Sequence, residues 1–268
     1  MGPARAPAVA GQFYPADPDT LARLVDSLLD AVPTGPDEPL AAAYVVPHAG
    51  YRYSGPTAAH VYGRLRAHAD EVRRVILIGP AHYARLMGCA VPSTSQWMTP
   101  LGPVTIDTDG CAELARAGLA TVDDRPHEPE HSLEVQLPFL QRSLRPDVII
   151  SPIVVGPATV DDVANTIAAA ASGGSSRDGT VVLCSTDLSH YLDDVSARQL
   201  DELTVRSVLG LAPEEIGVKH ACGVYALRGL VGWAECRRLS PTLLHQSTSA
   251  DTTGDPSRVV GYAALAIG

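Results

Sequence analysis

The stretch Thr-Val-Val-Leu-Cys-Ser-Thr-Asp-Leu-Ser-His, residues 180–190, joins a continuous apolar run to a group of polar side chains. A short apolar run rich in β-branched residues predicts a strand that is buried on both faces, as in a parallel sheet. Asp187 and His190 follow where this strand ends. Because ligands of open α/β sheets bind just beyond the carboxyl ends of the strands, this stretch predicts both a fold class and the position of a site.

Two further apolar runs end in the same way. Residues 42–46 lead into His48, and residues 74–78 lead into His82. A single histidine at a strand end is more often a structural hydrogen-bonding group than a functional one. If the three strands are parallel, however, their polar ends converge, and a shared site explains the pattern better than coincidence does.

Segments with helical periodicity alternate with these strands. Asp17 followed by Pro18 is typical of a helix start. Further helices are predicted over residues 55–68, 132–144, 159–171, 193–209 and 223–238, and further strands over 147–155 and 259–267. This alternation predicts an α/β fold with a mostly parallel or mixed central sheet and helices on both faces.

Some segments fit this pattern less simply. Pro138 predicts a kink in the helix over 132–144, and Pro152 places the strand over 147–155 at a sheet edge or a bulge. Residues 87–104 are interpreted as an insertion or a pocket wall. The Pro/Gly-rich stretches 32–39 and 172–179 are short enough to be loops, so a single domain over residues 1–268 is expected.

Composition excludes several classes of protein. The 268 residues carry 20 basic and 30 acidic side chains, a net charge of −10, which disfavours nucleic acid as a partner. The longest apolar run, residues 259–267, is about half of a membrane span. We expect no signal peptide, and the five widely spaced cysteines without a CxxC motif predict free thiols in a cytoplasmic protein without membrane partners. The sequence has no Walker loop, GxGxxG or GxSxG motif.

Several polar residues are candidates for chemistry. Asp187, three residues before His190, is interpreted either as the carboxylate that orients an acid–base imidazole or as a helix cap beside an unrelated histidine. Cys222 precedes the helix over 223–238, and a helix N-terminus lowers the pKa of a thiol, which favours a ligand or a nucleophile. His131 lies between Glu130 and Glu134, as a substrate-facing group or as part of a polar helix end. The other histidines and cysteines are predicted to be structural: His60, His68, His127, His220, His245, Cys89, Cys111, Cys184 and Cys236.

These motifs together resemble the MEMO family, including the protein B members of the bacterial three-gene Memo and radical-SAM system. The motifs occur in the family's order: residues 10–15 (AGQFYP), 47–51 (PHAGY) with 54–55 (SG), 79–82 (GPAH), 130–134 (EHSLE), 185–190 (STDLSH) and 221–223 (ACG). The family looks like class III extradiol dioxygenases in fold, and those enzymes hold Fe(II) with two histidines and a glutamate.

The resemblance implies roles for particular residues. It places His48 and His82 at the two histidine-ligand positions and Cys222 at the third, where a dioxygenase has Glu. It places His190, beside Asp187, at the acid–base position. It also implies three pocket residues, for which no firm role follows: His131, Phe13 and Tyr51. A thiolate in place of a carboxylate softens the site, so Cu or Zn could replace the Fe(II) that the resemblance favours.

The resulting hypothesis is a metal-dependent oxidoreductase that acts on a small-molecule substrate. The resemblance also implies a functional association with a radical-SAM protein. A non-catalytic scaffold that binds phosphopeptides, as animal relatives are described to do, is the alternative, although an acidic sequence with Lys219 as its single lysine is poorly suited to phosphate. Metal sequestration without turnover is a third hypothesis, and zinc hydrolysis a weaker fourth.

Overall fold

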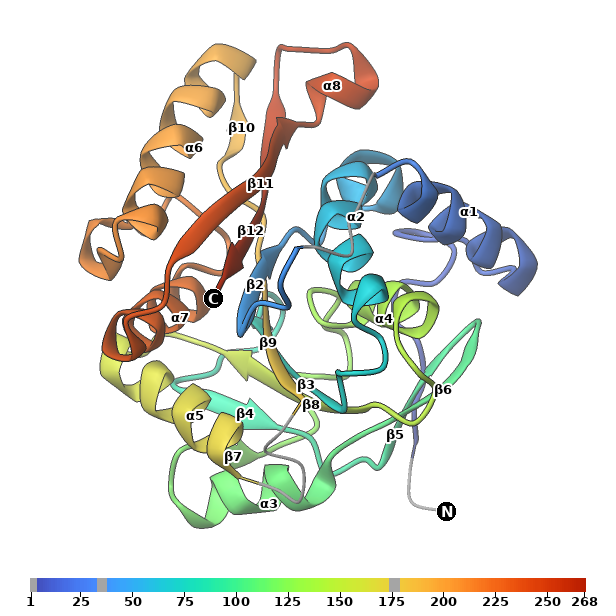
Figure 1. The fold of residues 1–268 in the computed structure, drawn as a ribbon, viewed down its shortest axis with the longest axis vertical. Helices are drawn as coiled ribbons and strands as arrows, with labels where there is room; N and C mark the ends of the chain where they lie inside the picture. Colours follow the sequence, from blue (N-terminus) through green and yellow to red (C-terminus); the bar gives the residue numbers. More distant parts are fainter. Residues whose placement is uncertain (1–3, 33–37, 174–178) are drawn as a thin grey trace.

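The computed structural model describes residues 4–32, 38–173 and 179–268. Most of the two loops predicted over 32–39 and 172–179 lies outside the described residues. The described residues form a nine-stranded main sheet, a three-stranded second sheet and surrounding helices (Figure 1). None of the described helices combines the length and the apolarity that crossing a lipid bilayer requires.

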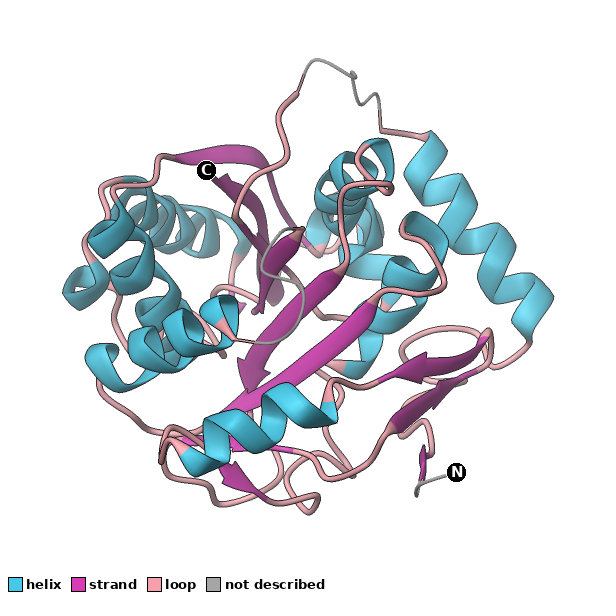
Figure 2. Ribbon diagram, turned by 60° about the horizontal axis from the view of Figure 1, so that its bottom comes forward, coloured by secondary structure: helices cyan, strands magenta, loops and turns pink. Residues whose placement is uncertain are grey.

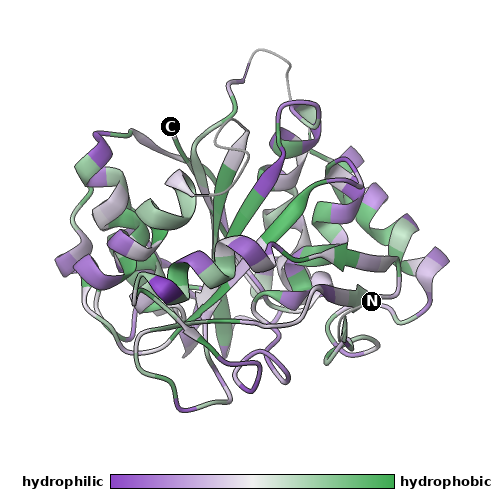
Figure 3. Cartoon of the chain, turned by 90° about the horizontal axis from the view of Figure 1, so that it is seen from below, coloured by the Kyte–Doolittle hydropathy of each residue, from purple (hydrophilic) through white to green (hydrophobic). Residues whose placement is uncertain are grey.

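Four parallel strands form the centre of the main sheet. In spatial order they are β2 (Ala43–Val46), β9 (Thr180–Ser185), β3 (Arg74–Pro80) and β8 (Ile149–Val155). Almost every residue of these strands is buried, and Figure 3 shows them as the most hydrophobic part of the molecule. The continuous apolar runs therefore mark strands covered on both faces, as predicted.

The flanks of the sheet make it mixed. Beside β2, the long strand β12 (Val259–Ile267) runs antiparallel and pairs on its other side with β11 (Pro241–Thr248) and β10 (His190–Leu192). Beside β8, β4 (Cys89–Val91) runs antiparallel and pairs with β7 (Thr121–Val122). An α/β fold with a mixed sheet is confirmed.

Helices cover both faces of the sheet (Figure 2). One layer contacts β3, β8, β9, β11 and β12, and consists of α3 (Thr108–Arg116), α5 (Val160–Ser172), α6 (Asp194–Leu209) and α7 (Val224–Arg237). The opposite layer consists of α1 (Pro18–Asp30), α2 (Tyr51–Ala67) and α4 (Leu137–Ser143). The short elements η2 (Pro213–Glu215) and α8 (Ala250–Thr253) lie in connections.

The predicted helix caps are present. The Asp17 carboxylate accepts a hydrogen bond from the Thr20 amide at the start of α1, and the Thr159 hydroxyl accepts one from the Asp162 amide at the start of α5. Helix α2 begins at Tyr51, earlier than the sequence pattern predicted. That early start leaves only two residues, Ala49 and Gly50, between His48 and α2.

Pro152 does not place its strand at the sheet edge. Strand β8 is internal, with β3 on one side and β4 on the other. On the β4 side, β8 contacts Asp107 through Ile150 and Ala90 through Val154, so Pro152 faces the gap between these two contacts. The backbone hydrogen-bonding groups of successive residues point to opposite sides of a strand, so Pro152 points to the same side as Ile150 and Val154. The N–H that proline lacks would therefore face β4 and not β3, and no hydrogen bond to β3 is lost.

The helix predicted over 132–144 is divided. Residues Glu134–Gln136 form the 3-10 turn η1, and α4 begins at Leu137. Pro138 therefore lies in the first turn of α4, where a missing N–H costs nothing, and no kinked helix forms.

Residues 87–104, interpreted as an insertion or a pocket wall, are divided between the two sheets. Strand β4 joins the main sheet, whereas β5 (Gln96–Thr99) and β6 (Gly102–Thr105) form a hairpin that pairs with β1 (Ala4–Arg5). None of these residues lines the pocket described below.

Candidate metal centre

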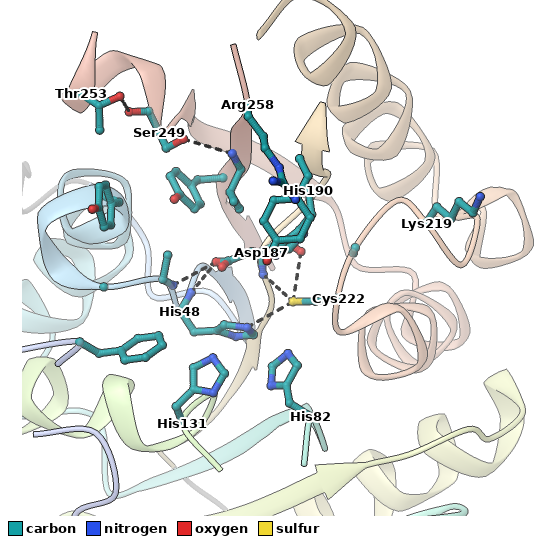
Figure 4. A pocket seen from close by; sticks show the side chains of 18 of the residues that line it. His48, His82, His131, Asp187, His190, Lys219, Cys222, Ser249, Thr253 and Arg258 are labelled. Carbon is teal, nitrogen blue, oxygen red and sulfur yellow. Dashed lines mark hydrogen bonds between the residues drawn. The ribbon is translucent and has the colours of Figure 1, made fainter. Parts of the chain in front are cut away.

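The predicted polar side chains meet beyond the carboxyl ends of the three adjacent parallel strands (Figure 4). His48 follows β2, Asp187 follows β9 and His82 follows β3, and β9 lies between the other two strands. They line a pocket of about 940 Å³ that also includes His131, His190 and Cys222. The five histidines that were predicted to be structural do not line this pocket.

Three histidines form the cluster that best fits a metal ion. One ligand nitrogen from each of His48, His82 and His131 lies within 4.8 Å of the other two. The rings of His82 and His131 stack with centroids 4.6 Å apart, and His48 stands edge-on to both. His131, for which no firm role was predicted, is therefore part of this cluster.

Cys222 lies at the edge of the cluster. Its Sγ is 3.2 Å from His48 Nε2, and the Asp187 amide donates to the same sulfur over 3.3 Å. Burial, with the charge of Asp187, raises the pKa of this thiol to about 12. The prediction that the helix N-terminus lowers the pKa of Cys222 is therefore wrong for the metal-free protein. The cost of removing the thiolate from water outweighs the effect of the helix dipole.

A buried carboxylate holds His82. Glu130 Oε1 lies 2.8 Å from His82 Nδ1, and Glu130 also accepts hydrogen bonds from the His82 and Ser132 amides. Burial would raise the pKa of Glu130, but the hydrogen bond and charge of His82 and these amides lower it to about 2. An ionised Glu130 requires a proton on His82 Nδ1, so the neutral form of His82 keeps its lone pair on Nε2, where a ligand can bind.

His48 and His131 are neutral at physiological pH. Burial and the neighbouring His82 lower the pKa of His48 to about 3. Burial, together with the neighbouring His48, lowers the pKa of His131 to about 4. Neutral imidazole is the form that binds metals, so His48 and His131 are in the ligating state before any ion arrives.

Asp187 does not hold His190 by a direct hydrogen bond. Its carboxylate accepts from the His48 amide over 2.7 Å and from the Ala49 amide over 3.3 Å. His190 Nδ1 instead lies 2.8 Å from the Leu188 carbonyl. The reason is the backbone path, since the chain turns after β9 so that Asp187 faces the end of β2 while His190 begins β10. Burial raises the pKa of Asp187, against the opposing effect of the His48 amide.

The residues implied for the pocket wall divide in two. Phe13 lines the pocket, with its ring 4.6 Å from the His131 ring. Tyr51 does not, because it points into the core against Phe139 and donates to the Val135 carbonyl. Tyr53, two residues further along α2, lines the pocket in its place.

Cationic side chains at the pocket were not predicted. Lys219 and Arg258 both line it, and the Arg258 guanidinium lies 4.4 Å from the centre of the Tyr191 ring. Tyr191 follows His190 in the left-handed backbone region, with φ of 64°. No sequence pattern indicates Arg258, because β12, which it precedes, pairs with β10 only in the folded sheet.

Comparisons with known proteins identify relatives over nearly the whole length. A family model described as Memo-like protein matches residues 5–266. A MEMO1 family protein of Aquifex aeolicus is 38% identical, with 96% of this chain and 97% of the relative covered. One of Sulfolobus acidocaldarius is 36% identical, with 98% and 99% covered. The crystal structure of an uncharacterized protein from Escherichia coli K12 aligns with a TM-score of 0.49 and 12% identity, over 84% of this chain and 99% of that one.

The fold and the site define an α/β protein whose pocket gathers histidines and a cysteine beyond the ends of parallel strands. The extent and identity of the sequence matches show that the chain belongs to the MEMO family. The resemblance drawn from the sequence motifs is thereby confirmed.

Proposed function

We propose that this protein binds a redox-active metal ion, Fe(II) foremost, and acts with it as an oxidoreductase on a small molecule in the pocket. The observation that carries this proposal is the cluster of His48, His82 and His131, whose ligand nitrogens lie within 4.8 Å of one another. The Cys222 sulfur, 3.2 Å from one of them, adds a fourth donor.

The donor set fits a transition metal. Two of the imidazoles have lowered pKa values, and His82 is held by a carboxylate in the way that ligating histidines usually are. Imidazoles with one thiolate suit iron and also Cu(I) or Zn(II). A bound iron ion would supply Lewis acidity and redox chemistry. A coordinating thiol is deprotonated, so the metal would reverse the raised pKa of Cys222.

The protein's own side chains would position the substrate and move a proton. The Leu188 carbonyl can only accept, so neutral His190 carries its proton on Nδ1 and leaves Nε2 free as a base. Phe13 and Tyr53 offer apolar surface to the substrate, whereas Lys219 and Arg258 offer positive charge. This arrangement suits a small molecule with an ionisable hydroxyl group.

Metal content after anaerobic purification tests the binding. We expect about one equivalent of metal in the wild type, and loss of it in a His48→Ala/His82→Ala variant. Cys222→Ala should weaken binding, whereas Cys236→Ala, which changes an exposed thiol of α7, is the matched control. Unchanged metal content after removal of both histidines and Cys222 would refute the proposal.

Dioxygen uptake tests the oxidoreductase. The iron-loaded protein, supplied with the small-molecule fraction of a cell extract, should consume dioxygen beyond the oxidation of its own iron. His190→Ala should abolish that uptake while it retains the metal. Tight metal binding without any uptake would favour sequestration instead.

A second candidate function is the binding of an anionic ligand without turnover. It is favoured by the position of Lys219 and Arg258, since the single lysine of this acidic chain lies at the pocket. Calorimetry with a phosphotyrosine peptide separates the two functions. A pure binding protein should bind the peptide equally well without metal and after His48→Ala/His82→Ala.

A further inference from the structure

Ser185 has more hydrogen-bond contacts than a hydroxyl usually makes. Its Oγ lies 2.6 Å from the Ser132 carbonyl, 2.8 Å from Gln136 Nε2 and 2.9 Å from His48 Nδ1. A hydroxyl has one proton to donate and two lone pairs that accept. The Ser132 carbonyl can only accept, so it takes the proton of Ser185. The two remaining neighbours must therefore both donate to Ser185.

The orientation of the Gln136 amide agrees with this assignment. One end of the amide lies 3.0 Å from the Pro47 carbonyl, which requires a donor, and must be the nitrogen. The other end accepts the Tyr62 hydroxyl proton over 2.7 Å and must be the oxygen. A rotated amide would place two oxygens in contact at Pro47. Gln136 thus directs one N–H at Ser185 and the other at the residue before His48.

Four side chains form a hydrogen-bond relay: Tyr62 donates to Gln136, and Gln136 and His48 both donate to Ser185. Each is at most 2% exposed. No water is present to replace a broken hydrogen bond at these buried groups. Leaving one of them without its native partner therefore costs substantial free energy. The relay joins three elements, since Tyr62 lies on α2, Gln136 in η1 and Ser185 at the end of β9. Ser185 pairs with Val46 of β2, which brings it beside His48.

We propose that this relay fixes neutral His48 as the Nδ1–H tautomer, with Gln136 and Ser185 as its positioning residues. The Nε2 lone pair of His48 is then aimed permanently at the Cys222 sulfur and the histidine cluster. The two strand-end histidines are consequently held differently. The His82 ring is oriented by the carboxylate of Glu130, whereas the His48 ring is oriented by the neutral hydroxyl of Ser185.

This inference deepens the proposed metal function, but its first test needs no metal. Long-range ¹H–¹⁵N NMR of the ¹⁵N-histidine-labelled, metal-free protein distinguishes protonated from unprotonated ring nitrogens. At neutral pH we expect His48, assigned with a His48→Gln variant, to show a protonated Nδ1 and an unprotonated Nε2. An Nε2–H tautomer in the wild type would overturn the proposal.

Substitutions in the relay give the second readout. Ser185→Ala removes the acceptor for Nδ1–H, so we expect His48 to shift to a mixture of tautomers or to the Nε2–H form. Ser151→Ala is the matched control, because Ser151 is an equally buried strand serine that bonds to Asp107 instead. An unchanged His48 spectrum in folded Ser185→Ala would refute the role of Ser185. If that variant does not fold, Ser185→Cys takes its place, because a thiol accepts a hydrogen bond only weakly and the same shift of the His48 tautomer is expected.

Metal affinity supplies the last readout. In competition with a chromophoric chelator for Zn(II), Ser185→Ala should bind about 10- to 100-fold more weakly, the usual effect of removing a partner of a ligating histidine. Gln136→Leu should weaken binding less, since Ser185 still accepts from His48. Failure of the wild type to bind metal would refute the proposed function and leave the tautomer result standing. Normal affinity in both variants would show that the relay does not position His48 for a metal.

Discussion

At the scale of single residues, the partner of each imidazole determines what that imidazole can do. Glu130 is 1% exposed, yet its pKa falls to about 2 because His82 and backbone amides favour its charged form. The carboxylate also lies 3.5 Å from His131 Nδ1. One buried charge therefore faces two of the three clustered histidines.

Replacement of Glu130 should separate orientation from charge. Glu130→Gln retains the size of the side chain but removes the negative charge, so we expect metal affinity to fall about 10- to 100-fold. Equilibrium dialysis against Zn(II) measures this effect. Glu128→Gln, a nearby exposed residue, is the control. Equal affinity in both variants would contradict a role for the Glu130 charge.

At the scale of elements, the N-terminal segment is held against the site by Glu134. This carboxylate, fully buried in η1, accepts from the Ala8 and Val9 amides and from the Tyr14 hydroxyl. It also forms an ion pair of 2.7 Å with Arg5. The segment between these contacts carries Phe13 onto His131. The motifs at 10–15 and 130–134 are thus two halves of one contact.

Loss of the Glu134 charge should loosen that segment. Glu134→Gln leaves Arg5 without its buried partner, which typically costs 3–5 kcal/mol, so we expect the free energy of unfolding to fall by about 3 kcal/mol. Chymotrypsin should also cleave faster after Phe13. The exposed pair of Glu202 with Arg206 supplies the control, since Glu202→Gln should cost less than about 1 kcal/mol. Resistance to cleavage equal to that of the wild type would argue against this anchoring role.

Elements were predictable where local chemistry sets them. Apolar runs and caps identified the central strands and the starts of α1 and α5. The divided segment at 134–143 and the internal position of Pro152 depend on what lies beside each residue in space. Sequence periodicity carries no such information, because the gap that accommodates Pro152 is created by strands distant in sequence.

At the scale of the whole molecule, burial of histidines links stability to pH. Burial lowers the pKa of His127 to about 4, as it does for His131, and lowers that of His48 to about 3. An unfolded histidine titrates near 6.5. Between about pH 6.5 and 4 the unfolded chain therefore binds protons that the folded protein excludes. Asp187 has a raised pKa, so its own contribution to the stability of the folded protein increases as pH falls.

The metal-free protein should therefore lose stability as pH falls below 6.5. Each of these histidines contributes a slope approaching about 1.4 kcal/mol per pH unit. Urea unfolding at pH 7.5, 6.5 and 5.5 measures the total, and His127→Gln should reduce the slope by one histidine. A stability that is constant or increases over this range would contradict the buried neutral state of these rings.

The α/β class, the family and the side chains that gather beyond β2, β3 and β9 could be read from the amino-acid sequence, because buried parallel strands and motif order are local properties of the chain. The hydrogen-bond partner of each of these side chains could be seen only in the folded molecule. In the folded molecule, Asp187 accepts a hydrogen bond from the His48 amide and makes none with His190. Tyr51 points into the core, and Gln136 donates to Ser185. These pairings depend on the distances between segments far apart in sequence, and desolvation acts only after those segments have packed.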